Sequence, residues 1–213
     1  MKNCRGMTIL DLVATMAIAA ILVTAAAPSF DRYMRNNAVY TDRKNLNTAV
    51  MSARYEAVAR NKTVTMCPSV AGEDCGGDWS DGWIIFQDDG AGGGTARDGI
   101  RNGGEPVIHA FLYHGTNLFT VFNPSDNSAV DFLSFNEYGR PAVDGTVTSR
   151  PVVIQVCDSN HDSHYARGLM LISTGRLLQT VDSDGDGVHE SRFADGSNTI
   201  SINTPLSCEN EIS

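Results

Sequence analysis

The pattern of apolar and polar positions changes near residue 61, and the two parts of the chain predict different structures. Residues 7–27 are almost wholly apolar, apart from an acidic residue, Asp11. At about 1.5 Å per residue, a helix of this length spans the ~30 Å hydrocarbon core of a bilayer. Lys2 and Arg5 precede the run, and positive charge there favours a cytoplasmic N-terminus. The run therefore predicts a membrane-spanning helix.

The helical pattern continues beyond Pro28, with apolar residues at positions i, i+3, i+4 and i+7 of one helix face. These residues are Leu46, Ala49, Val50 and Ala53. Because a proline inside a helix removes a hydrogen bond and bends the helix, a kink is expected at Pro28. We therefore expect one long helix whose first half is apolar all round. Its second half should pack an apolar stripe on a globular body.

The rest of the chain consists of short apolar or alternating runs, separated by segments rich in glycine, aspartate and asparagine. This sequence pattern is typical of antiparallel strands joined by turns. The expected strands are residues 63–67, 82–86, 106–113, 129–135, 151–157, 168–173, 176–181 and 198–203. The predicted fold class is α+β, with a long N-terminal helix packed on an antiparallel head of one or two sheets. No internal repeat and no second domain are predicted.

The net charge and the sequence motifs argue against several classes of function. The formal net charge of −9 argues against binding of nucleic acid over the whole surface, because clustered lysine and arginine drive such binding. The glycine-rich residues 90–94 lack the lysine of a phosphate-binding loop. No arrangement suggests a nucleophile with its base, so no enzymatic activity is predicted. The surrounding residues 87–105 contain several acidic residues and are expected to form a flexible loop.

The five cysteines lie at positions 4, 67, 75, 157 and 208. If Cys4 leaves with a leader, four remain, and four cysteines allow three pairings. Cys67 and Cys75 would close a short loop, which leaves Cys157 to pair with Cys208. Two disulfides fit an exported protein in an oxidising compartment. The alternative, buried free cysteines in a cytosolic protein, disagrees with the apolar N-terminal segment.

An acidic segment near the C-terminus resembles the first half of a calcium-binding loop. Asp182, Asp184 and Asp186 occupy positions 1, 3 and 5, and Gly187 supplies the turn at position 6. Glu190 at position 9 would complete the ligand set, since position 12 is not glutamate. Calcium is the one cofactor that the sequence suggests. The alternative is a solvated hairpin turn, for which aspartate and glycine are the favoured residues.

The N-terminal segment reads RGMTILDLVATMAIAAILVTAAAPSF, in which Gly6 precedes Met7, Asp11 is fifth after that junction and Pro28 follows the apolar run. This segment resembles the class III signal sequence of type IV pilins and pseudopilins. Four further stretches, residues 39–69, 81–89, 103–111 and 168–178, also carry a likeness. They are similar to the GspH/FimT family of minor pilins.

The resemblance implies a maturation route and a role for Asp11. A prepilin peptidase would cut after Gly6, and the new amine of Met7 would be methylated. Asp11 would pair with the amine of a neighbouring subunit during assembly. The family usually has phenylalanine where Met7 stands and glutamate where Asp11 stands. The implied organisation is a leader (1–6), a transmembrane helix half (7–27), an amphipathic helix half (28–61) and a β-rich head (62–213).

The function that follows is structural. The chain would be a minor pilin or pseudopilin held in the inner membrane, with its head in the periplasm, which assembles with other subunits into a type IV pilus or a type II secretion pseudopilus. One alternative is a DNA-binding pilin of a competence pilus. Arg176 would serve it, but position 178 is leucine and acidic residues follow. A second alternative is a secreted domain released by cleavage after Ala27.

Overall fold

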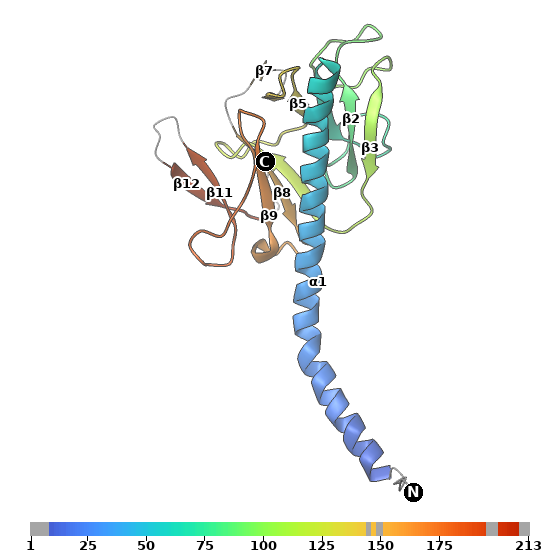
Figure 1. Cartoon of the computed structure of the whole chain (residues 1–213), viewed down its shortest axis with the longest axis vertical. Coiled ribbons are helices and arrows are strands. Elements are labelled where there is room, and N and C mark those ends of the chain that lie inside the picture. Colours follow the sequence, from blue (N-terminus) through green and yellow to red (C-terminus); the bar gives the residue numbers. More distant parts are fainter. Residues whose placement is uncertain (1–8, 144–145, 148–150, 195–199, 209–213) are drawn as a thin grey trace, which may run out of the picture. The chain divides into compact units, whose positions relative to one another are not determined.

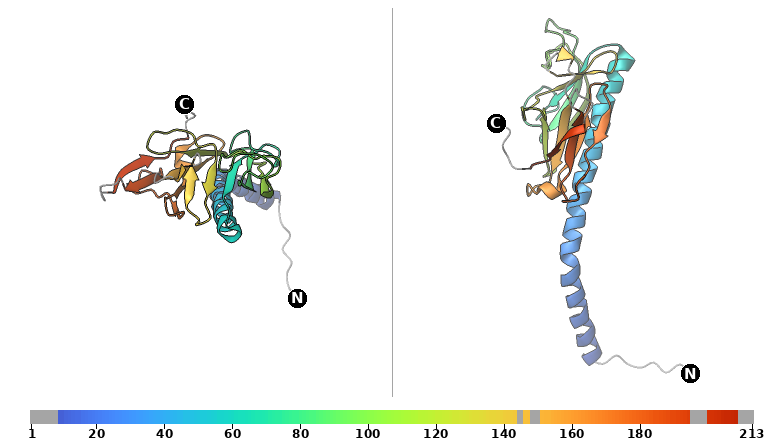
Figure 2. Two further views of the ribbon diagram at one scale, coloured as in Figure 1. Left: turned by 90° about the horizontal axis from the view of Figure 1, so that it is seen from above. Right: turned by 90° about the vertical axis from the view of Figure 1, so that its left-hand side faces the viewer.

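The computed structural model describes residues 9–143, 146–147, 151–194 and 200–208. The chain forms two compact units, residues 1–37 and 38–213. The helix α1 (Ile9–Arg60) contributes to both units, and all described strands belong to the second, which we call the head (Figures 1 and 2). The expected α+β architecture is confirmed: one long N-terminal helix and antiparallel sheets.

The first unit consists, in its described part, of residues 9–37 of α1. Its large apolar side chains, such as Ile9, Leu10 and Ile21, are exposed. The hydroxyl groups of Thr15 and Thr24 donate to backbone carbonyls one turn earlier, which satisfies these polar groups within the helix itself. Among the described residues, α1 is the one helix that is long and apolar enough to cross a membrane.

Pro28 lies inside α1, and the helix continues beyond it as expected. The kink predicted at Pro28 stays a prediction. In the head, the helix buries a stripe of residues at helical spacing: Val39, Leu46, Val50, Ala53 and Ala57. Ala49 is partly buried and packs on the same core. The apolar face predicted for the second half of the helix is therefore confirmed.

The strands of the head form two larger sheets and a separate pair. The first sheet contains, in spatial order, β3 (Val107–Leu112), β2 (Gly82–Gln87), β1 (Val64–Pro68), β5 (Leu133–Phe135), β6 (Pro141–Val143) and β7 (Thr146–Val147). The second contains β10 (Leu177–Gln179), β9 (Arg167–Leu171), β8 (Val152–Cys157) and β4 (Leu118–Phe122). The pair consists of β11 (Glu190–Ala194) and β12 (Ile200–Pro205). All neighbouring strands are antiparallel.

The core of the head lies where α1 meets both sheets. Leu46 and Val50 belong to the same buried cluster as Trp83 from β2 and Ile154 from β8. Alternation along a strand sends neighbouring residues to opposite faces. Accordingly, the residues on the other face of β2, Ile84 and Phe86, join a smaller cluster with Cys67. Figure 1 shows the pair β11–β12 on the other side of the head from β3, and Figure 2 agrees.

The structure differs from the predicted strands in five places. The sequence analysis did not foresee β4, although residues 118–122 alternate between partly buried and buried positions. It also missed β6, β7 and β11. The strand expected at residues 129–135 is shorter, with β5 beginning at Leu133 and an isolated bridge at Ala129. The two- and three-residue strands β5, β6 and β7 carry too little periodicity to stand out from the turns beside them.

Polar contacts also hold α1 to the head. The carboxylate oxygen Oδ2 of Asp42 accepts hydrogen bonds from the Tyr113 hydroxyl and from Nδ2 of Asn117, both at 2.7 Å. Burial and the Asp42 carboxylate raise the pKa of Tyr113, which keeps its hydroxyl protonated as a donor. One turn of helix after the buried Val50, Nε of Arg54 donates to the carbonyl oxygen of Gly139 at 2.9 Å. These bonds fix the rotation of α1 against the sheets.

We predict that Asp42→Ala lowers the free energy of unfolding of the head by about 2–3 kcal/mol, because two partly buried donors lose a charged acceptor. Urea unfolding of the full chain in detergent micelles, followed by tryptophan fluorescence, measures this loss. The control is Asp31→Ala on the same helix, which removes one exposed ion pair with Arg35 and should change stability by less than about 1 kcal/mol. Equal urea midpoints for the two variants would contradict the prediction.

Candidate functional site

The predicted maturation and assembly site lies at the N-terminus. Gly6 and Met7, the expected cleavage and methylation positions, lie outside the described residues. Asp11 is in the first turn of α1 and is exposed. A carboxylate is favourable near the positive end of the helix dipole, but at membrane depth a charge costs about 2.5–3.5 kcal/mol on insertion scales. Charged residues at this depth are rare, and those that occur usually pair with another charged or polar group.

The helix also presents apolar side chains on the faces that are not buried. In the first unit, Phe30 and Tyr33 are about two-thirds exposed. In the head, Met51, Tyr55 and Val58 recur at the i, i+4 and i+7 spacing of one helix face and are 37%, 70% and 50% exposed. This stripe, Met51–Tyr55–Val58, lies beside the buried stripe on the same helix. It offers an apolar contact surface to another helix or head.

Two disulfides hold the head together. The structure pairs Cys67 with Cys75, across a separation of 8 residues, and Cys157 with Cys208, across 51. These are the pairs that the sequence predicts. The first closes a loop next to β1, and the second ties the segment after β12 to β8. Closing the longer loop removes more chain entropy from the unfolded state.

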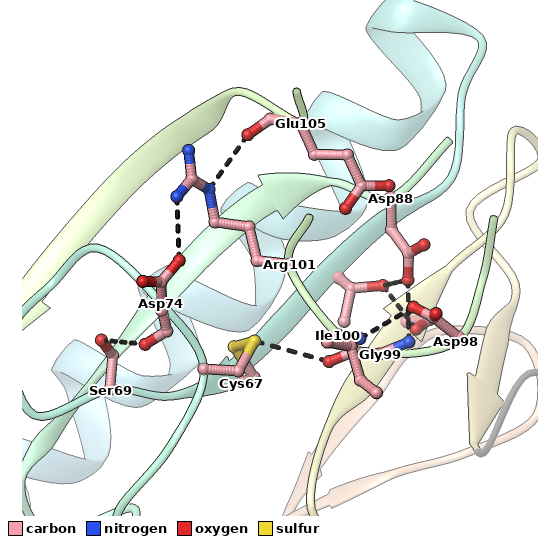
Figure 3. The surroundings of a disulfide bond; sticks show 12 residues. Cys67, Ser69, Asp74, Asp88, Asp98, Gly99, Ile100, Arg101 and Glu105 are labelled. Atoms are coloured by element: carbon pink, nitrogen blue, oxygen red, sulfur yellow. Dashed lines mark hydrogen bonds and ion pairs between the residues drawn. A yellow bond between two sulfur atoms is a disulfide. The ribbon is translucent and has the colours of Figure 1, made fainter. Parts of the chain in front are cut away.

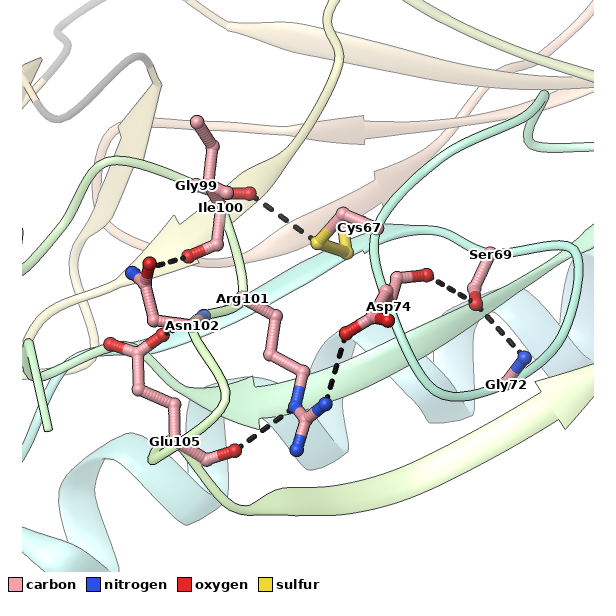
Figure 4. A network of polar contacts seen from close by, with 10 residues as sticks. Cys67, Ser69, Gly72, Asp74, Gly99, Ile100, Arg101, Asn102 and Glu105 are labelled. Atoms are coloured by element: carbon pink, nitrogen blue, oxygen red, sulfur yellow. Dashed lines mark hydrogen bonds and ion pairs between the residues drawn. A yellow bond between two sulfur atoms is a disulfide. The ribbon is translucent and has the colours of Figure 1, made fainter. Parts of the chain in front are cut away.

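The loop closed by Cys67–Cys75 is joined to the acidic loop at residues 87–105. The Cys75 sulfur lies 3.4 Å from the carbonyl oxygen of Gly99 (Figure 3). Arg101 bridges the two loops, since its Nη1 contacts the Asp74 carboxylate at 3.0 Å and its Nε donates to the carbonyl oxygen of Glu105 at 3.0 Å (Figure 4). The two loops therefore form one layer over the face of the first sheet that is turned away from α1.

Two buried carboxylates organise the acidic loop from within. Asp88 accepts hydrogen bonds from the Thr65 hydroxyl at 2.8 Å and from the backbone N–H groups of Arg97 and Gly99. Glu105 accepts from the backbone N–H groups of Gly90 and Asn102, both at 2.8 Å. Both side chains are fully buried. The sequence analysis expected a loop here but could not show that its own acidic residues anchor it.

Asp88 and its neighbour Asp89 have opposite pKa shifts. Burial raises the pKa of Asp88, and the hydrogen bonds that it accepts oppose this shift only in part. The hydrogen bond from Gln87, together with the contact to Lys62, lowers the pKa of Asp89. Protonated Asp88 therefore contributes stability that is present at acidic pH and lost as the pH rises through its raised pKa. Ionised Asp89 contributes stability that is lost as the pH falls through its lowered pKa.

We predict that Asp88 titrates at a higher pH than Asp89, although the two are adjacent in sequence. The carboxyl carbons, followed by NMR over a pH titration of the full chain in micelles, report each pKa separately. If Asp88 titrates at or below the pH at which Asp89 does, the burial argument fails.

The predicted calcium ligands come together in the structure. One carboxylate oxygen from each of Asp182, Asp184, Asp186 and Glu190 lies within 4.8 Å of the others. The three aspartates are exposed, whereas Glu190 is 3% exposed. Backbone N–H groups of the loop also bind the aspartates; Gly185 and Gly187, for example, donate to the two oxygens of Asp182. The loop therefore gathers negative charge in a geometry that suits an oxygen-liganded cation.

We predict that calcium raises the melting temperature of the full chain by about 5–10 °C at a concentration ~100 times its dissociation constant. Asp184→Asn should reduce this shift, because it removes one charged ligand. Asp126→Asn, in a turn elsewhere in the head, should leave it unchanged. Differential scanning calorimetry with and without calcium makes the measurement. No shift at millimolar calcium would reject the site and leave the solvated turn.

A cavity of about 610 Å³ lies beside β4, lined in part by Trp79, Phe119 and Gln155. The Gln155 side chain is buried, and its Nε2 donates to the carbonyl oxygen of Ser207 at 2.6 Å. Its Oε1 is buried without a hydrogen-bond partner among the described residues. The walls of the cavity combine aromatic side chains, such as Trp79 and Phe119, with polar groups. The sequence offers no signal for it, because its lining comes from separate segments.

Comparison with known families decides the assignment. The family described as Type II transport protein GspH matches residues 43–175, which is more than half of the chain. The chain belongs to the GspH family. The matched residues include most of the buried stripe of α1, every strand of the two larger sheets except β10, and the first disulfide. The GspH/FimT resemblance predicted from the sequence is thus confirmed.

Solved structures give a weaker likeness to this GspH-family chain. The type IV minor pilin FimU of Pseudomonas aeruginosa is 18% identical, over 69% of this chain and 91% of that one, with a TM-score of 0.46. The minor pseudopilin EpsH from the Type 2 Secretion System of Vibrio cholerae is 8% identical, over 66% and 94% of the two chains, with a TM-score of 0.42. No curated protein sequence matches the chain.

Proposed function

We propose that this GspH-family chain is a minor pilin or pseudopilin, a structural subunit without enzymatic turnover that assembles into a type IV pilus or a type II secretion pseudopilus. The observation that carries the proposal is that the two parts of α1 expose their apolar side chains differently. Residues 9–37 expose apolar side chains along their length, whereas the later part buries one stripe in the head and exposes another. A helix of this kind is stable in a membrane and in a bundle of like helices.

The route to the filament follows from the N-terminal residues. A prepilin peptidase would cut between Gly6 and Met7, and methylation would follow at the Met7 amine. The helix from Met7 would stay in the inner membrane with the head in the periplasm, because the positive charges of Lys2 and Arg5 precede the apolar run. On joining the filament, the helix would exchange lipid contacts for contacts with other helices.

Asp11 would guide that exchange. Cleavage after Gly6 creates an amine four residues before Asp11. In a bundle of apolar helices, a buried amine and a buried carboxylate from neighbouring subunits each offset the desolvation of the other. An aspartate reaches one methylene less far than glutamate, so the pair requires a closer approach of the two helices.

We predict that Asp11→Ala is processed and held in the membrane but enters filaments at least about tenfold less, because an incoming amine would be buried without its carboxylate. N-terminal sequencing of the membrane fraction should find the chain beginning at Met7. Immunoblotting of filaments sheared from cells measures incorporation. Asp11→Glu is the conservative control and should assemble at least as well as the parent.

Asp31→Ala provides a second control, since Asp31 is an exposed carboxylate farther along the same helix. Normal incorporation of Asp11→Ala would contradict the role of the carboxylate. A mature chain that begins near Ser29 would contradict the whole assembly proposal, since the helix would have been removed as an ordinary signal peptide.

Binding of DNA remains the contrasting function for a pilin of this family. Arg176 is exposed in the turn between β9 and β10, but the exposed carboxylates of Asp182, Asp184 and Asp186 follow in the chain and repel phosphate. We therefore favour assembly over DNA uptake. Salt-sensitive retardation of double-stranded DNA by micromolar full chain in a gel shift would reverse this preference.

A further inference from the structure

The strand β3 is the outer strand of the first sheet. It pairs with β2 on one side and has no strand neighbour on the other among the described residues. Figure 1 shows β3 at the rim of the head, on the outer side of β2. An edge strand presents a row of N–H and C=O groups that another extended chain can pair with.

The hydrogen-bond alternation identifies which groups point outward. Tyr113 donates its backbone N–H to the carbonyl oxygen of Asp81, and Gln87 donates to that of Pro106. In an antiparallel pair, every second residue bonds to the partner strand, so Phe111 and His109 bond to β2. The N–H and C=O groups of Ala110 and Leu112 therefore point away from the sheet. In the described part of the chain, neither residue makes a backbone hydrogen bond on this outer side.

The side chains of β3 lack the usual protection of an edge. The strand reads VIHAFL, with no lysine, acidic residue or proline inside it. Phe111 is 37% and Leu112 is 40% exposed, and Val70 on the adjoining loop is 62% exposed. Proteins commonly block such an edge with charge, proline or a bulge, since an exposed apolar edge invites pairing. The single bulge of β3 lies at its start, next to Phe86, and leaves the outer half regular.

We propose that β3 is a docking site for an extended segment of another polypeptide, which adds to the first sheet as a further strand. Main-chain bonds to Ala110 and Leu112 would set the register of the added strand. On one face its side chains would cover Phe111, which already stacks on Trp83 with ring centroids 4.6 Å apart. On the other face they would cover Leu112, beside the loop closed by Cys67–Cys75.

The surrounding charge indicates the kind of segment. The loop between β1 and β2 carries Glu73, Asp74, Asp78 and Asp81 and no basic residue. This loop flanks the outer half of β3: Asp81 bonds to the residue after the strand, and Gly72 lies close to the side chains of Ala110 and Leu112. Arg101 pairs with Asp74, and on the helix side His109 lies near Glu56 at 3.9 Å.

The remaining acidic charge selects against a second copy of this chain. Antiparallel pairing of two β3 strands would bring two such acidic loops toward one edge, where like charges repel. The complementary occupant is a segment with alternating apolar side chains between basic flanks. This proposal does not rest on filament assembly, because it concerns binding by the isolated chain.

The test uses the full chain in dodecyl maltoside micelles and a fluorescein-labelled peptide of alternating threonine and valine between two lysine pairs. Fluorescence anisotropy measures binding, with empty micelles as the blank. A peptide with the same core between glutamate pairs is the charge control and should bind at least about tenfold more weakly at low salt. Hydrogen exchange at the amides of Ala110 and Leu112 should slow when the lysine-flanked peptide is bound.

Two matched variants test the place of binding. Ala110→Pro removes an outward N–H while keeping the bonds to β2, and should weaken binding about tenfold. Gln179→Pro makes the same change on β10, the edge of the second sheet, where Thr180 donates inward to Gly168, and should leave binding unchanged. Leu112→Lys keeps the backbone donor, adds positive charge to the edge and should also weaken binding. The test therefore remains decisive even if Ala110→Pro does not fold.

Three outcomes would overturn the proposal. The first is the absence of binding at millimolar peptide, and the second is equal binding by the parent chain, Ala110→Pro and Leu112→Lys. The third is self-association of the full chain that Ala110→Pro abolishes, seen by analytical ultracentrifugation, since it would identify a second copy as the occupant. Each leaves the assembly proposal intact, because that proposal is tested by incorporation of Asp11→Ala into filaments.

Discussion

The head depends on one interaction, the burial of a stripe of α1 between two antiparallel sheets. The main buried cluster combines residues of both sheets with Leu46, Val50 and Ala53 of the helix. Burial of each large aliphatic side chain contributes about 1.5–3 kcal/mol. The same helix carries the membrane-spanning pattern, so the stability of the head and the proposed attachment to the membrane depend on one continuous element.

The second constraint is electrostatic. The chain has a formal net charge of −9, and the head places several carboxylates where they organise backbone instead of merely facing solvent. Asp88 and Glu105 are fully buried and accept N–H groups from their own loop, while Asp42 binds the helix to the segment after β3. Buried acceptors of this kind are stable only when their donors are in place. The long loops are thus ordered by polar contacts where apolar residues are scarce.

The helix, its buried stripe and the fold class could be predicted from the sequence, because long periodic segments are strong local signals. The short separation of Cys67 and Cys75 indicated the first disulfide, and the pair Cys157–Cys208 followed by elimination. The acidic cluster from Asp182 to Glu190 was also accessible, since its spacing is local. Other features depend on contacts between distant segments. Burial of Glu105, the isolated acceptor of Gln155 and the outer position of β3 arise from how strands pair, and no local pattern encodes that order.

The two contact surfaces of the head differ in what they can specify. An exposed apolar stripe such as Met51–Tyr55–Val58 favours association, but hydrophobic contact is non-directional, and a neighbour can slide or rotate along a helix at little cost. An edge strand is different, because its N–H and C=O groups repeat at fixed intervals and a shift of one residue turns every side chain of the partner to the wrong face. A subunit that offers both can separate the two tasks. The helix would supply adhesion, and the edge of β3 would supply register and choice of partner.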